Sequence, residues 1–289
     1  MNTDINQSSL IRFLVGRFDF IIRLFYSKMR FYKLFNFFLP RLHSSDFESL
    51  DRYFHIITGE LKKQGFSIRG KSVLEIGPGN SHINAYNFLL NGCRKVIFID
   101  KHPRFFDTGR QRSFMRDEIR YFKSKYRVKK FEYINEDTGA LNPSYMEFIA
   151  GGLPAVAFPG KVDFIYSIAV LHHIKDLERY IRKMHEILNK DGMMYHVIDL
   201  KDKFHFFGNP FLFYKYSDFV WENFLTEETL TYTNRIRYRE YVDLFTRYGF
   251  KIVWEKTVSH DFPVFKINKK FAGRSDLHIG DAHFLLEKV

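Results

Sequence analysis

A chain of 289 residues can bury a substantial core, and this length fits one enlarged α/β domain better than two full domains. Hydrophobic residues make up 45% of the chain and Phe alone occurs 34 times, which excludes disorder for most of it. Cys93 is the only cysteine, which excludes an internal disulfide and a cysteine-based metal cluster and indicates a reducing compartment such as the cytoplasm.

The net charge of +12 is uneven, because eleven Lys and Arg residues lie between Lys101 and Lys130 against three acids. Such an excess favours an anionic partner, which could be nucleic acid, a phosphorylated sugar or a membrane surface. A basic helix that is simply solvated explains the same pattern.

Residues 1–45 form a basic and aromatic extension, in which Asp19 is the only acid between Ile5 and Asp46. Charges interrupt every apolar run before the roughly 18 residues that a membrane span needs, and no signal-peptide cleavage site is expected. We expect a helix that packs over the domain or a second subunit, or that lies on an anionic membrane. In the membrane case, the cations that would meet lipid headgroups are Arg12, Arg17, Arg23, Lys28, Arg30 and Lys33.

From residue 71 onward, apolar runs typical of strands alternate with helical patterns. This alternation predicts a Rossmann-like, doubly wound α/β sheet that is mostly parallel and has helices on both faces. Strands are expected at residues 72–77, 95–100, 131–135, 163–168 and 193–200. Helices are expected at residues 82–91, 105–125, 143–150 and 176–188, with a turn at 189–192 after the last of them.

The end of the chain departs from this alternation. A helix is expected at residues 237–249, and strands at 250–259 and 282–289 follow it without a helix between them. Strands joined in this way form an antiparallel pair, so the final strand should be antiparallel to the rest of the sheet. We expect one domain at residues 46–289 behind the N-terminal extension.

The glycine turn after the first strand, Gly77-Pro78-Gly79-Asn80-Ser81-His82, brings backbone close to a ligand. A dinucleotide fingerprint needs Gly or Ala where His82 stands, and Pro78 lacks an N–H group that could bind a phosphate. Asp100 ends the second strand, where a carboxylate can accept both hydroxyls of a ribose. These residues together favour a nucleoside without a pyrophosphate.

At this point the chain resembles the class I S-adenosylmethionine-dependent methyltransferases over roughly residues 50–289. "VLEIGPGNS" and "VIFID" are similar to the first two motifs of the family, and "FEYINEDTGAL" is similar to the segment whose acid lies near the adenine. "VDFIYSIAVLHHIKDLERYIRKMHEILNKDGMMYHVIDL" is similar to the fourth and fifth motifs. The resemblance implies that the protein is an enzyme with S-adenosyl-L-methionine as its cofactor.

The resemblance also implies roles for individual residues, and it assigns no metal ligands. Glu75, Gly77 and Gly79 would line the methionine end of the cofactor, and Asp100 would hold the ribose. The remaining cofactor-binding residues would be Asn80 in the turn, Asp137 at the adenine amino group, and Ser167 and Ile168 beneath the sulfonium.

Methyl transfer to a hydroxyl needs a base that removes its proton. His172 and His173 follow the fourth strand, while Asp199 and His205 lie at and after the end of the fifth. Alternation along that strand sends His196 and Asp199 to opposite faces. We predict that Asp199 or His205 supports proton removal, although each histidine is also explained as a hydrogen-bonded packing residue.

Residues 201–234 occupy the usual place of an acceptor-binding insertion in the family, and ten of the residues from Phe204 to Phe224 are aromatic. They could stack on sugar faces, cover a lipid-linked acceptor, or only pack a lid onto the core. We expect methylation of a hydroxyl on a small molecule or on a sugar or glycolipid intermediate of surface polysaccharide synthesis, in the cytoplasm or at the inner membrane face. The alternatives are an RNA methyltransferase and a catalytically silent binding subunit.

Overall fold

The computed structural model describes residues 19–21, 23, 46–101, 109–202, 210–226, 232–261 and 267–289. Residues 19–21 and 23 are helical. The described elements continue, in chain order, as α3 (Phe47–Lys63), β1 (Ser72–Ile76), α4 (Ile83–Leu90), β2 (Lys95–Asp100), α5 (Gly109–Tyr126), β3 (Met146–Ala150), η1 (Leu153–Ala155), β4 (Val162–Ile168), η2 (Leu171–His173), α6 (Leu177–Ile187), β5 (Leu188–Asp199), η3 (Leu212–Lys215), α7 (Asp218–Val220), η4 (Trp221–Leu225), α8 (Tyr238–Arg247), β6 (Phe250–Ser259) and β7 (Ile279–Lys288).

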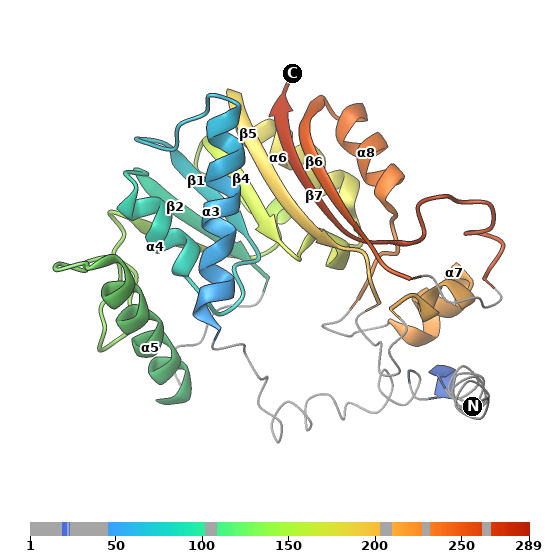
Figure 1. The fold of residues 1–289 in the computed structure, drawn as a ribbon, viewed down its shortest axis with the longest axis horizontal. Coiled ribbons are helices and arrows are strands. Elements are labelled where there is room, and N and C mark those ends of the chain that lie inside the picture. The colour runs from blue at the N-terminus through green and yellow to red at the C-terminus, as the bar shows by residue number, and fades with distance from the viewer. Residues whose placement is uncertain are drawn as a thin grey trace, which may run out of the picture.

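One seven-stranded sheet in the order β3-β2-β1-β4-β5-β7-β6 organises the molecule (Figure 1). The first five strands are parallel, whereas β7 is antiparallel to both β5 and β6. The predicted doubly wound sheet with an antiparallel end is therefore confirmed. Strand order reverses between β1 and β4, which is where the carboxyl ends of such a sheet open for a ligand.

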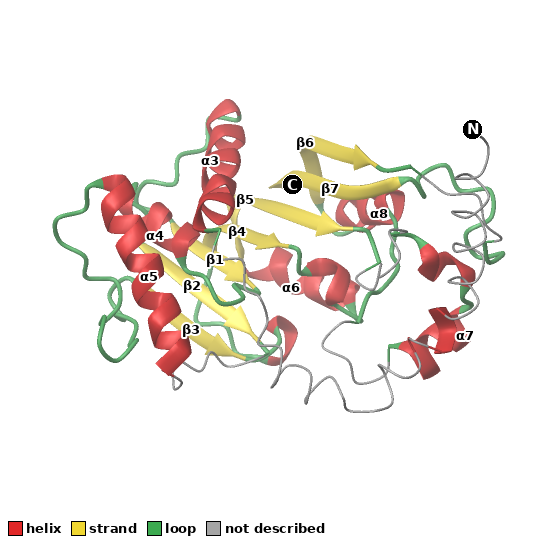
Figure 2. Cartoon of the chain, turned by 60° about the horizontal axis from the view of Figure 1, so that its bottom comes forward, coloured by secondary structure: helices red, strands yellow, loops and turns green. Residues whose placement is uncertain are grey.

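Helices cover the sheet on two faces, as Figure 2 shows. Val73, Phe98 and Tyr166 point to the face covered by α3, α4 and α5, and Leu74 and Ile165 point to the face covered by α6 and α8. Successive residues of β1 thus alternate between two cores. The apolar stripe predicted for α6 is buried, and Asp176 caps this helix by accepting from the Arg179 amide.

Three predicted elements are wrong. Residues 143–150 contain the third strand instead of a helix, and residues 131–135 make only the isolated bridge between Ile134 and Leu141. Phe131 and Tyr133 pack on Tyr86 of α4, so their aromatic rings serve a helix face and not the sheet. The turn expected at 189–192 lies within β5, whose pairing with β4 is irregular there. Short apolar runs do not distinguish a strand from a helix by periodicity, which explains the exchange.

A buried carboxylate joins the helices of one face. Asp51 of α3 accepts hydrogen bonds from Lys125 Nζ at 2.7 Å, Tyr126 Oη at 2.8 Å and Asn87 Nδ2 at 2.5 Å. Burial alone would raise the pKa of Asp51, but these donors outweigh it and hold the pKa below its ordinary value. The ionised carboxylate therefore ties α3 to α4 and α5.

Replacement of Asp51 by alanine is expected to lower the free energy of unfolding by about 2 kcal/mol, because the buried donors lose their acceptor. A lowered folded-state pKa gives stability that is present above the unfolded-state pKa and lost as the pH falls through the folded-state value. Chemical denaturation at neutral pH and at pH values below the ordinary aspartate range would measure this. The difference between wild type and variant should shrink in acid; a constant difference would contradict the linkage.

Candidate active site

The turn after β1 has the conformation that its glycines predict. Gly77 and Gly79 have φ values of +67° and +60°, which favour glycine. A Cβ atom on Gly77 would lie 2.6 Å from Val170 Cγ2, whereas one on Gly79 would meet no heavy atom within 4 Å. Gly77 is thus required by packing against the loop after β4. Gly79 leaves bare, exposed backbone that a ligand can approach closely.

The amino end of α4 already holds an anion, which is the carboxylate of Glu118 from α5. This fully buried group accepts from the His82 amide at 3.0 Å and from the Ser81 hydroxyl. The first amides of a helix are the groups that would otherwise bind a phosphate. The site therefore suits a nucleoside without phosphates. Sequence reasoning missed Glu118, because it lies 36 positions from His82 in a helix noticed only for its cations.

Five predicted cofactor residues come together at the carboxyl edge of β1 and β2. Ile76 pairs with Ile99, so Asp100 lies beside the start of the glycine turn, half-buried. Glu75 is buried near the end of β1, and Asn80 is half-buried in the turn with Gly77 and Gly79. A carboxylate next to the exposed backbone of a glycine turn fits a ligand in which a ribose is attached to a group without phosphate.

Asp137 does not lie at this edge. The strand that should have preceded it is absent, and the segment 127–145 enters β3 at its amino end. Asp137 is exposed, and its amide donates to Asn135 Oδ1 at 3.0 Å in a turn. The connection that follows the carboxyl end of β3 is Gly151-Gly152, and the Gly151 amide donates to the Asp100 carbonyl at 2.7 Å. The adenine assignment of Asp137 therefore loses its structural basis.

Ser167 belongs to the core, since it is fully buried and its Oγ lies 2.8 Å from His196 Nδ1. His196 stacks on Phe245 of α8. Burial lowers the pKa of His196 to about 3, so the imidazole is neutral, and it has no access to solvent. Ile168 is half-buried at the end of β4. The next residue, Ala169, is exposed with a φ of +56°, a strained conformation of the kind that gathers at functional sites.

The loop after β4 carries the two adjacent histidines beside the glycine turn, because Val170 contacts Gly77. The rings of His172 and His173 are 3.8 Å apart, and His172 is the more buried. His173 Nδ1 lies 2.5 Å from the Tyr232 carbonyl oxygen. A carbonyl can only accept, so Nδ1 carries the proton and the basic lone pair is on Nε2.

Asp199 ends β5 as predicted, but its carboxylate is engaged. Lys201 Nζ lies 3.0 Å from Asp199 Oδ1, and the same ammonium contacts Asp281, which pairs with Asp199 across β5 and β7. His260 Nε2 completes this ionic cluster, 3.1 Å from Asp281 Oδ2. The Asp199 carboxylate is thus held by Lys201 within the ionic cluster, away from the imidazoles beside the glycine turn. His205 lies outside the described residues.

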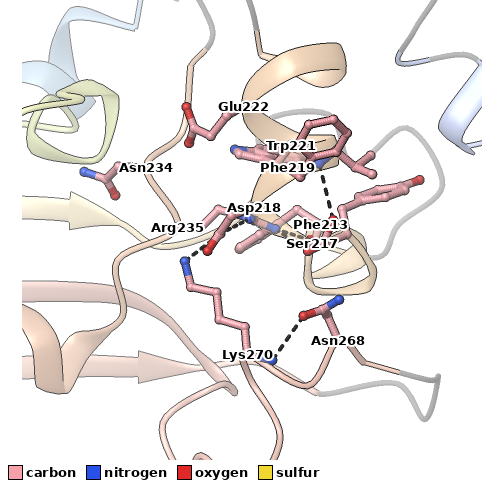
Figure 3. Close-up of polar contacts among 12 residues, drawn as sticks. Phe213, Ser217, Asp218, Phe219, Trp221, Glu222, Asn234, Arg235, Asn268 and Lys270 are labelled. Carbon is pink, nitrogen blue, oxygen red and sulfur yellow. Dashed lines mark hydrogen bonds and ion pairs between the residues drawn. The ribbon is translucent and has the colours of Figure 1, made fainter.

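The described part of the insertion forms a small core of its own with the segment before β7. Phe213, Trp221 and Phe271 are buried in this cluster. Arg235, also buried, lies between the rings of Trp221 and Phe271 at 4.9 and 5.3 Å from their centroids, and it contacts Asp218 at 2.5 Å (Figure 3). Most of the described aromatic side chains of the insertion therefore pack against one another and form the core of a lid. We call residues 210–226 with 267–277 the lid cluster.

The N-terminal extension contacts this lid cluster at the residues that the structure describes. Arg23 is buried, with Nε 2.8 Å from Asp19 Oδ2 and Nη1 3.1 Å from Asp202 Oδ1. Tyr216 of the lid donates to Asp19 at 2.7 Å. Burial alone would lower the pKa of Arg23, but the two carboxylates raise it above its ordinary value. In the membrane alternative Arg23 would meet lipid headgroups, whereas its charge is used inside the protein, in agreement with the alternative that the extension packs over the domain.

The basic stretch is partly neutralised where it is described. Ion pairs join Arg120 to Asp117, Lys125 to Asp51, Lys123 to Glu136 and Lys130 to Glu132. A surface hollow of about 570 Å³ next to it is lined by both signs of charge. Cys93 donates to the Lys71 carbonyl, and burial raises its pKa to about 12, so thiolate chemistry is excluded.

The parallel sheet, its order and the glycine turn beside Asp100 define the class I methyltransferase fold. The chain belongs to the methyltransferase domain family, whose model matches residues 49–255. It is an S-adenosylmethionine-dependent methyltransferase, and its cofactor is S-adenosyl-L-methionine. No curated protein matches the sequence.

Two solved structures illustrate the likeness of fold. A 1,6-didemethyltoxoflavin-N1-methyltransferase from Burkholderia thailandensis, with its substrate and S-adenosylhomocysteine bound, is 13% identical with a TM-score of 0.50, and the match covers 90% of this chain and 87% of that one. A magnesium protoporphyrin IX methyltransferase from Synechocystis with bound S-adenosylhomocysteine is 11% identical with a TM-score of 0.48, covering 93% and 98%. No described helix is long and apolar enough to span a membrane.

Proposed function

We propose that the protein methylates a hydroxyl group of a sugar or glycolipid intermediate of cell-surface polysaccharide synthesis, in the cytoplasm at the inner face of the membrane. The observation that carries the choice of a hydroxyl is the tautomer of His173, fixed by the Tyr232 carbonyl 2.5 Å from Nδ1. The exposed rings of Phe219 and Phe224 in the lid cluster support an amphiphilic acceptor, because exposed aromatic side chains can pack on sugar rings and lipid chains.

Each part of the site has a role in this reaction. Asp100 would bind the ribose hydroxyls, and the backbone at Gly79 would admit the methionine chain close to Glu75. When bound, S-adenosylmethionine supplies an electrophilic methyl group. His173 Nε2 would take the proton of the acceptor hydroxyl while the hydroxyl oxygen forms the new bond to the methyl carbon. Alignment of the acceptor with the methyl group would supply the remaining part of the rate enhancement.

The acceptor is found by incubating the protein with labelled S-adenosylmethionine and fractionated extract of its own organism. Label in a sugar or lipid-linked sugar, on oxygen, supports the proposal. Label in RNA would favour the alternative methyltransferase, which the ion-paired residues of α5 make less attractive. No label with any fraction, together with no cofactor binding in calorimetry, would indicate a silent binding subunit.

With the acceptor in hand, His173→Ala is expected to lower kcat by about a hundredfold to ten-thousandfold, the usual contribution of a general base. Cofactor affinity should be unchanged, because the loss falls on the chemical step. Asp199→Asn is the comparison, with a smaller loss expected because Lys201 neutralises that carboxylate. If Asp199→Asn lowered kcat to this extent and His173→Ala did not, the base would be Asp199.

A further inference from the structure

Three of the six large apolar side chains that are exposed among the described residues lie on the lid cluster and on the N-terminal helix attached to it. Phe219 is 68% exposed, Ile21 58% and Phe224 38%. The rings of Phe219 and Phe224 contact each other, with centroids 5.8 Å apart. Exposed apolar side chains that gather on a surface can mark a contact with a partner or a membrane.

Buried contacts attach the helix that carries Ile21 to the lid cluster. The helix that carries Ile21 is fixed by the buried Arg23, which joins Asp19 to Asp202, and Phe20 lies 6.2 Å from the ring of Tyr216 in the lid. In Figure 1 the described N-terminal residues, in blue, lie on the same side of the molecule as α7. Ile21 and the pair Phe219 and Phe224 thus belong to two segments, far apart in the sequence, that these contacts join.

The charges around these side chains point to an anionic surface. The acids of the described insertion are paired, Asp218 with Arg235 and Lys270, and Glu222 with Lys175. Asp19, the only acid between Ile5 and Asp46, is used by Arg23. Lys269 is exposed in the segment that packs on the lid, and Asp218 is shared by two cations, so the group of Asp218, Arg235 and Lys270 keeps a net positive charge. Apolar groups flanked by cations match the interface of an anionic bilayer.

We propose that Phe219, Phe224 and Ile21 form a membrane-docking surface that inserts into the headgroup region of an anionic lipid bilayer. A bilayer suits these few side chains better than a stable protein partner, which needs about 800 Å² from each side. The lid follows the carboxyl end of β5, so docking brings the acceptor edge of the site to the membrane. The acceptor side of this inference rests on the proposed function, whereas membrane binding itself does not.

Flotation of the full chain with lipid vesicles tests the surface without any turnover. The vesicles are phosphatidylcholine alone, or phosphatidylcholine mixed with phosphatidylglycerol in equal parts. Wild type should bind the mixed vesicles, and the double variant Phe219→Ser/Phe224→Ser should bind them about tenfold more weakly or less, because its apolar anchors are gone. Leu90→Ser, which changes a side chain 40% exposed at the end of α4, is the matched control and should bind as wild type does.

Several results would contradict the proposed membrane-docking surface. Wild type that fails to float, equal binding to both kinds of vesicle, or equal losses in the double variant and Leu90→Ser would each do so. So would a wild-type dimer that the double variant breaks, since a second copy would then be the occupant. Thermal unfolding and cofactor affinity should be the same in all three proteins, which separates a failure of docking from a failure of the methyltransferase site.

Discussion

Asp100→Ala is expected to weaken S-adenosylmethionine binding by roughly a hundredfold, about 3 kcal/mol, with little effect on thermal stability. A carboxylate that accepts two ribose hydroxyls makes two charge-assisted hydrogen bonds, each worth about 1.5–3 kcal/mol. Asp100 is half-buried at the end of β2, where its side chain is not part of either hydrophobic core. Loss of the carboxylate should therefore affect ligand binding and leave the fold intact.

Asp137→Ala is the matched control for this prediction, because it removes an exposed carboxylate from the loop that enters β3 at the opposite end. Calorimetric titration with S-adenosylmethionine should give the same affinity for this variant as for wild type. A large loss in Asp137→Ala with none in Asp100→Ala would reverse the assignment. It would also mean that the loop at 127–145 reaches the ligand.

The two glycines of the turn are expected to respond differently to alanine. Gly77→Ala should lower the free energy of unfolding by about 2–4 kcal/mol, because the new Cβ lies 2.6 Å from Val170 and the backbone keeps a positive φ. Gly79→Ala has no such neighbour and should cost only about 1 kcal/mol for its left-handed backbone. Its effect should fall instead on the cofactor, whose closest approach the added methyl group would block.

Chemical denaturation and calorimetry of both variants separate these outcomes, with Val170→Ala in the Gly77→Ala background as a further test. Shortening Val170 should recover part of the lost stability, since it removes the two methyl groups nearest to the new Cβ. A stable Gly77→Ala protein, or a Gly79→Ala protein with wild-type cofactor affinity, would contradict this account of the turn.

Sequence patterns correctly predicted the elements whose length and hydrophobic periodicity indicate the same type of secondary structure. The long amphipathic stripe of α6 and the near-continuous apolar run of β2 are examples, and both elements lie where they were expected. Residues 131–150 were misassigned because "FEYIN" and "YMEFIA" are both short and rich in apolar residues. Only the neighbours that each segment meets in space, Tyr86 for Phe131 and Val96 for Met146, decide which one joins the sheet.

The candidate site was predictable where a residue is placed by the end of a strand, as Asp100 is placed by the end of β2. Contacts between distant segments were not predictable. Glu118 at the amino end of α4 and Arg23 beside Asp202 are both charged residues in basic stretches, and the charge pattern gave each an exposed role. Both side chains are buried because the fold places them beside partners that are distant in the sequence, His82 for Glu118 and Asp202 for Arg23.

Calorimetric titration of the full chain with S-adenosylmethionine tests the central claim most directly. We predict binding to a single site in wild type, weakened by Asp100→Ala and unchanged by Asp137→Ala. An absence of heat of binding in the folded wild type, or equal affinity in all three proteins, would contradict the assignment of the cofactor to the carboxyl edge of β1 and β2.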